Sequence, residues 1–92
     1  MDPMEDLDQI IKNYIIKELM VDRQGVALES NQSLIQEGII DSLAVFTIIG
    51  FLEDKFGIKI AEEDVVLDNF DTVDTIKALV RAKLAAKGSQ QT

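Results

Sequence analysis

One short polar pair, Asp41-Ser42, stands between Ile39-Ile40 and Leu43, where a helical pattern begins. A serine in the first turn of a helix has an ordinary role, because its oxygen can accept a hydrogen bond from a free backbone N–H. The same position suits a phosphate ester, since the N–H groups and the dipole at a helix N-terminus favour negative charge. Asp41 competes for the capping role, so one of the two side chains is left over. The residue types alone therefore leave two uses for Ser42 open, capping and covalent modification.

No residue type in the chain is suited to activate the Ser42 hydroxyl as a nucleophile. The 92 residues include no His and no Cys, which excludes Ser-His and Cys-His nucleophiles, thiolate zinc sites and disulfides. The acids between positions 64 and 74 lack the Gly and the terminal Glu of an EF-hand loop, so no metal site is expected. Chemistry at Ser42 must then be done by another protein, and the sequence favours a modified carrier over an enzyme.

Two of the helices that must position Ser42 are visible as apolar residues at three- and four-residue spacing. The first helix is expected at about 4–20, with Asp2 as its N-cap and acids in its first turn. The second is expected to start at Asp41 or Ser42 and to run to position 56, where Gly57 can end it in a left-handed conformation. Ser42 is thus predicted at the N-terminus of the second helix.

A long loop, positions 21–40, connects these two helices. No helical period persists in it, apart from a possible turn near positions 33–36, and its glycines and serines are typical of a loop. A connection of this length in a small domain is unusual and is more often functional or packed down than idle. The apolar residues expected to anchor it are Val26, Leu28, Leu34, Ile35, Ile39 and Ile40.

The rest of the chain predicts a short extended connector at 58–60, a short third helix within 61–67 and a last helix. Asp71 or Thr72 is expected to cap the last helix, and Gly88 to end it, with 89–92 as a disordered tail. Its expected buried face is Val73, Ile76, Leu79, Val80 and Leu84. The prediction is an all-α fold, a small four-helix bundle of three longer helices plus one short helix, forming a single domain over 1–88.

The second helix is predicted to have two apolar faces instead of one. At about 100° per residue, one stripe is expected to face the core, made of Val45, Ile48, Ile49, Leu52 and Phe56. A second group falls on the outward side beside Ser42: Leu43, Phe46, Thr47 and Gly50. Exposed Leu and Phe at these positions call for an explanation.

The charge distribution limits the kinds of partner. The formal net charge is −8, which argues against nucleic acid and favours partners with basic patches. The N-terminus is acidic where a signal peptide would be basic, and no apolar run approaches the length of a membrane span. We therefore expect a cytoplasmic protein without membrane insertion, and a monomer.

Three motifs resemble those of one known family. Glu37-Gly38-Ile39-Ile40-Asp41-Ser42-Leu43 is followed by Phe56-Gly57-Ile58 and then by Phe70-Asp71-Thr72-Val73. In this order, and with the four predicted helices, the motifs resemble the phosphopantetheine-binding carrier proteins, which include acyl, peptidyl and D-alanyl carriers. Asp-Ser-Leu alone is short and common, but the combination is specific and the resemblance covers nearly the whole chain.

The resemblance implies a role for each matched residue. In the family, the Ser that matches Ser42 receives 4′-phosphopantetheine from coenzyme A through a separate Mg²⁺-dependent phosphopantetheinyl transferase. The thiol of that arm then carries acyl or aminoacyl groups as thioesters, delivered by an adenylating or acyl-transferring enzyme. The Asp that matches Asp41 helps to present the serine. The second helix is the family's recognition face, on which Leu43, Phe46, Thr47 and Gly50 fall.

The outward face of the second helix departs from one branch of the family. Fatty-acid-synthesis carriers typically have acids there, whereas here the face is uncharged until Glu53 and Asp54. This difference favours a stand-alone peptidyl or specialised acyl carrier, as in secondary-metabolite biosynthesis. Two alternatives remain: a D-alanyl carrier, suggested by the Phe70-Asp71-Thr72 turn, and an unmodified helical interaction protein.

Overall fold

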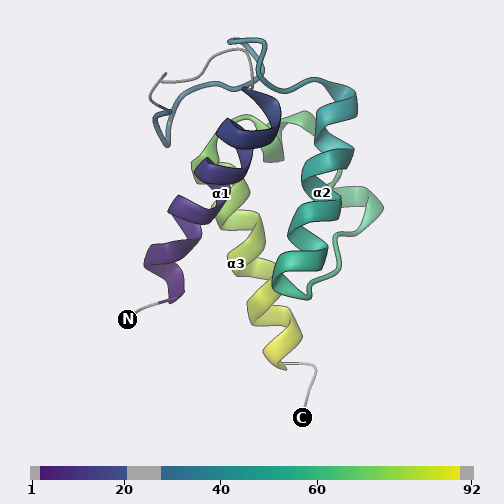
Figure 1. The fold of residues 1–92 in the computed structure, drawn as a ribbon. Coiled ribbons are helices and arrows are strands. Elements are labelled where there is room, and N and C mark those ends of the chain that lie inside the picture. The colour runs from purple at the N-terminus through teal and green to yellow at the C-terminus, as the bar shows by residue number, and fades with distance from the viewer. Residues whose placement is uncertain (1–2, 21–27, 90–92) are drawn as a thin grey trace.

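The computed structural model describes residues 3–20 and 28–89. Its secondary structure in these ranges is entirely helical: α1 (Pro3–Leu19), α2 (Ser42–Phe56), the 3₁₀ turns η2 (Glu62–Asp64) and η3 (Leu67–Phe70), and α3 (Val73–Ser89). Figure 1 shows α3 between α1 and α2, with the described part of the long loop, residues 28–40, crossing one end of the bundle. The predicted all-α bundle with a loop between its first two long helices is confirmed. The predicted cap Asp2, the predicted anchor Val26 and positions 90–92 lie outside the described residues.

The prediction of one short third helix within 61–67 is wrong in the type and number of its turns. The chain makes two separate 3₁₀ turns, with Val65 and Val66 between them outside any helix. The Asp64 carboxylate accepts a hydrogen bond from Ala61 N–H at 3.2 Å, which closes the first turn on itself. Branched side chains at 65 and 66 also disfavour helix, because their χ1 freedom is lost against the preceding turn. The last helix differs by one residue, since it passes Gly88 and ends at Ser89.

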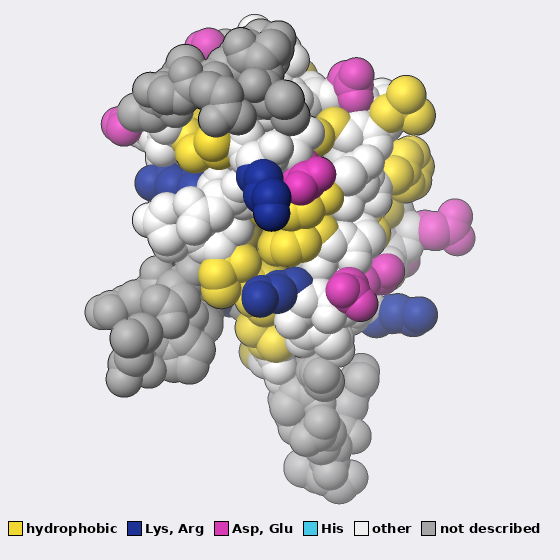
Figure 2. Space-filling view, viewed as in Figure 1, with side chains coloured by type: hydrophobic (Ala, Val, Ile, Leu, Met, Phe, Trp, Pro, Cys, Tyr) yellow, Lys and Arg dark blue, Asp and Glu magenta, His cyan; other side chains and the backbone are white. Residues whose placement is uncertain are grey.

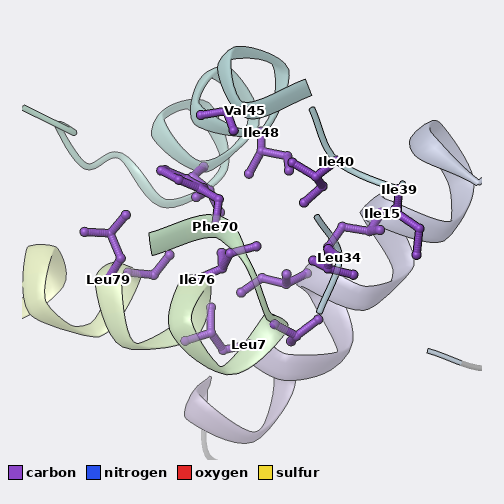
Figure 3. Close-up of a cluster of buried hydrophobic side chains, with 14 of the residues drawn as sticks. Leu7, Ile15, Leu34, Ile39, Ile40, Val45, Ile48, Phe70, Ile76 and Leu79 are labelled. Carbon is purple, nitrogen blue, oxygen red and sulfur yellow. The ribbon is translucent and has the colours of Figure 1, made fainter. Parts of the chain in front are cut away.

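The core is built from aliphatic side chains of all three long helices, the loop and the 58–60 connector, together with Phe70 of η3. Figure 3 shows Phe70 of η3 among side chains of α2 and α3, with Leu34 of the loop nearer α1. The predicted loop anchors Leu28, Leu34, Ile39 and Ile40 are buried, and Ile35 packs against the core. On α3, Val73, Ile76, Leu79 and Val80 are buried and Leu84 is partly buried, as the spacing predicted.

The loop is fixed to the start of α3 through Asp71. The backbone N–H of Leu34 donates to the Asp71 carbonyl oxygen at 2.6 Å, and Ser33 Oγ donates to Asp71 Oδ1 at 2.6 Å. A helical turn closes here, because Glu37 N–H donates to Ser33 O at 3.1 Å. Gly38 follows with a φ of 75°, a left-handed conformation that glycine adopts without steric cost. The loop therefore delivers Ile39 and Ile40 to the core directly before α2.

Local capping fixes the start of α3, next to this loop, and the end of α2. Thr72, one of the two predicted caps, accepts a hydrogen bond from Thr75 N–H at 3.0 Å, so Asp71 remains available to the loop. Gly57 has φ 64° and ends α2 as predicted, with its N–H bonded to Glu53 O at 2.9 Å. Ile58 and Ile60 are buried and Lys59 is exposed, which confirms the extended connector.

Two ion-pair groups join distant parts of the chain. Lys83 of α3 pairs with Asp64 of η2 at 2.5 Å, and this hydrogen bond lowers the pKa of the Asp64 carboxyl. Lys77 of α3 and Lys12 of α1 both pair with Asp8. Burial raises the pKa of Asp8, but the hydrogen bonds from Ser30, Lys12 and Lys77 outweigh it, so the pKa of Asp8 lies below its ordinary value. No helix in the described part of the chain is long and apolar enough to cross a membrane.

Candidate functional site

Ser42 is the first residue of α2, and its side chain is exposed. Asp41 is the N-cap, with φ −125° and ψ −171°, and its Oδ1 accepts a hydrogen bond from Ala44 N–H at 2.9 Å. The carbonyl oxygen of Asp41 accepts from Val45 N–H at 3.1 Å, so the helix starts in the usual way. Asp41 therefore fills the capping role that the sequence left open between the two residues, and Ser42 is an exposed residue at a helix N-terminus.

Replacing Asp41 by Ala is expected to lower the free energy of unfolding by about 0.5–2 kcal/mol, the usual cost of losing an N-cap. Asn is a comparable cap, so Asp41→Asn is the matched variant that keeps the hydrogen bond to Ala44 and removes the charge. Urea denaturation followed by circular dichroism measures both. Equal losses for Ala and Asn would show that the charge, and not the cap, stabilises this helix start.

The two apolar faces predicted for α2 are both present. Val45, Ile48 and Leu52 are buried, and Ile49 and Phe56 are partly buried against the core. The outward residues Leu43 and Phe46 are 78% and 64% exposed, and Thr47 and Gly50 are exposed as well. A Cβ built at Gly50 meets no heavy atom within 4 Å, so packing inside the chain does not require glycine there. Recognition by a partner remains a prediction for these four residues.

Beside Ser42 lies an apolar groove that the sequence did not reveal. It has a volume of about 210 Å³ and is lined by Ser42, Val45, Phe46, Val65, Val66 and Leu67. Val66 and Leu67 are 48% and 45% exposed, which extends the apolar surface of α2 onto the segment between η2 and η3. The one signal in the sequence is the run Val65-Val66-Leu67 within an acidic stretch, which by itself predicts only part of a short helix.

The chemistry available here is that of an accessible hydroxyl next to an apolar surface. The chain supplies no imidazole or thiol as base or nucleophile. The Asp41 carboxylate is engaged by the backbone of its own helix. The N–H groups at the start of α2 can stabilise an anionic ester on Ser42, and the neighbouring groove can contact an apolar group attached to it.

Comparison with known proteins agrees with this geometry. The family model described as "Phosphopantetheine attachment site" matches residues 9–82, a range that includes Ser42 and the helices around it. The probable acyl carrier protein PigG of Serratia sp. (strain ATCC 39006) is 29% identical over 75 residues, which is 82% of this chain and 85% of that protein.

Proposed function

Since the chain belongs to the family of phosphopantetheine-bearing carrier proteins, we propose that Ser42 is its attachment residue and that it carries acyl or aminoacyl groups without being an enzyme itself. The observation that supports this most directly is that the two adjacent residues at the start of α2 have different roles. Asp41 caps the helix, and Ser42 stays exposed with no capping role. A cytoplasmic location is part of the same proposal.

The residues around Ser42 fit the covalent 4′-phosphopantetheine that this family carries. Ser42 Oγ forms the new bond to phosphorus, the bond from that phosphorus to adenosine 3′,5′-bisphosphate breaks, and the hydroxyl proton passes to a base of the transferase. The backbone N–H groups that begin α2 favour the resulting phosphodiester. When bound, the arm supplies the thiol on which cargo is held as a thioester, which explains how a chain without Cys can serve as a carrier.

The surface of α2 supports a peptidyl or specialised acyl carrier over a fatty-acid-synthesis one. Leu43 and Phe46 are exposed and uncharged, so partner enzymes would dock largely by apolar contact. The name of the relative PigG favours an acyl cargo. The Asp71 turn does not favour a D-alanyl carrier, because Asp71 already has a structural role in binding Ser33 and the loop. The partners in this proposal are a phosphopantetheinyl transferase and the enzymes that load and use the thioester.

Mass spectrometry after incubation with coenzyme A, Mg²⁺ and a broad-specificity phosphopantetheinyl transferase tests the proposal. The chain should gain the mass of one 4′-phosphopantetheine. A chain that gains nothing while the transferase modifies an established carrier in the same tube is an unmodified helical interaction protein, the second candidate. A panel of acyl and aminoacyl donors with their loading enzymes then separates the subtypes by the thioester that forms.

Phe46→Ala is expected to leave the melting temperature nearly unchanged, because its side chain is 64% exposed and surface substitutions usually change stability by no more than about 0.5 kcal/mol. The rate of loading by the transferase should fall, since an exposed aromatic residue next to the modified serine is a typical interface anchor. Thermal denaturation and a mass-based time course measure the two effects. A large fall in melting temperature, or an unchanged rate, would remove Phe46 from the recognition surface.

A further inference from the structure

A second groove lies between α1 and α2. It has a volume of about 350 Å³, and its apolar lining is Ile10 and Tyr14 of α1 and Phe51 of α2. The rings of Tyr14 and Phe51 stack, with centroids 3.8 Å apart and planes 15° from parallel. Figure 2 shows hydrophobic side chains gathered in the middle of one face of the molecule, with a Lys or Arg side chain above and below them and an Asp or Glu side chain next to the upper one. Both rings are partly buried against the core and also line the groove, and aromatic residues are enriched at protein interfaces.

The charge around this groove is opposite in sign to that of the chain. Lys17 and Lys55 line it together with one acid, Glu18, so the local excess is positive although the whole chain has a net charge of −8. The ion pairs among the described residues use Lys12, Lys77 and Lys83, and neither groove lysine takes part in them. The two lysines are therefore available to carboxylates of another molecule.

The groove is separate from the attachment serine. Phe51 and Lys55 follow Ser42 by nine and thirteen residues, which places them about 13 Å and 20 Å further along the helix axis. At 100° per residue, Phe51 lies about 180° around α2 from Ser42. A peptide segment bound at the groove would thus leave the Ser42 side chain uncovered.

We propose that the groove between α1 and α2 docks an acidic segment of a partner protein, with an aromatic or aliphatic side chain of that segment against Tyr14 and Phe51 and its carboxylates on Lys17 and Lys55. The open, shallow shape of the groove, with two lysines beside its apolar lining, suits a peptide segment that combines an apolar side chain with acidic neighbours. Such docking would hold the chain near its enzymes without occupying Ser42. It does not depend on what Ser42 carries.

A displayed library of random peptides, selected on the full-length unmodified protein, tests the proposal without assuming a partner. Enriched peptides should combine one aromatic or large aliphatic residue with flanking Asp or Glu. In ¹⁵N-edited NMR spectra of the wild-type protein they should shift the amides of Tyr14, Lys17, Phe51 and Lys55. Their affinity should fall about tenfold or more in Lys17→Glu/Lys55→Glu, since two attractive charges become repulsive, and loading of Ser42 should continue with peptide bound.

The matched control is Lys59→Glu/Arg81→Glu, which changes the net charge equally at two exposed residues that do not line the groove. It should retain the affinity of the wild-type protein. Lys17 and Lys55 also stabilise their helices, because each lies in a last turn. Thermal denaturation of each variant shows whether a loss of peptide affinity comes from a loss of stability. The proposal is overturned if no peptides are enriched, if the enriched peptides are basic, or if they shift the amides of Leu43 and Phe46. Equal losses of peptide affinity in both double variants would also overturn it, as would a dimer of this chain that occupies the groove.

Discussion

Ser42→Ala is expected to abolish the gain of one 4′-phosphopantetheine that the wild-type chain shows with coenzyme A and a transferase. The methyl group cannot form the phosphodiester, and no other residue occupies the same position at the start of α2. The melting temperature should stay close to that of the wild-type protein, because the Ser42 side chain is exposed and Asp41 provides the cap. Intact-mass spectrometry and thermal denaturation of the same preparations measure the two results together.

Thr47→Val is a suitable control for this experiment. Thr47 is a second exposed hydroxyl on α2, and Val has nearly the same shape. Given time to reach its end point, this variant should gain one arm like the wild-type protein. A Ser42→Ala chain that still gains the arm would place the attachment at another hydroxyl, whereas a wild-type chain that gains none would reject the carrier proposal as a whole.

The bounds of α2 and the residues on its two faces could be predicted from the sequence, because the signals for them are local. An Asp-Ser pair before an apolar periodic run predicts a helix start, and Gly57 predicts its end, so the bounds of α2 agree with Ser42–Phe56. The separation of buried Leu52 from exposed Phe46 also follows from helical geometry alone. Which of Asp41 and Ser42 caps the helix could not be predicted, since both side chains can reach the backbone. The orientation seen in the structure decides it.

The two grooves could not be predicted, because each depends on segments that are distant in the sequence. The residues Val65–Leu67 lie far from Ser42 in the sequence, and the Asp64–Lys83 pair and the buried Phe70 connect η2 and η3 to the long helices beside it. The stack of Tyr14 on Phe51 depends on how α1 and α2 approach each other. Helical periodicity states which face of a helix is apolar, but it does not state which other element will cover that face.

Leu52→Ala is expected to lower the free energy of unfolding by about 2–5 kcal/mol, the range for removing most of a buried leucine side chain. Leu52 has no exposed surface and lies among the core residues that hold α2 in the bundle. For a domain of this size, each 1 kcal/mol corresponds to roughly 4–8 °C in melting temperature, so the shift should be easy to measure. Urea denaturation gives the free energy and thermal denaturation the shift.

The matched control is Leu43→Ala, the same chemical change on the same helix at a side chain that is 78% exposed. Its effect on stability should stay within about 0.5 kcal/mol, because no cavity forms where the side chain already faces water. The rate of loading at Ser42 should show the reverse pattern. It should fall in Leu43→Ala, whereas the folded fraction of Leu52→Ala should still be loaded. Similar stability losses in both variants would contradict the assignment of one face of α2 to the core and the other to partners.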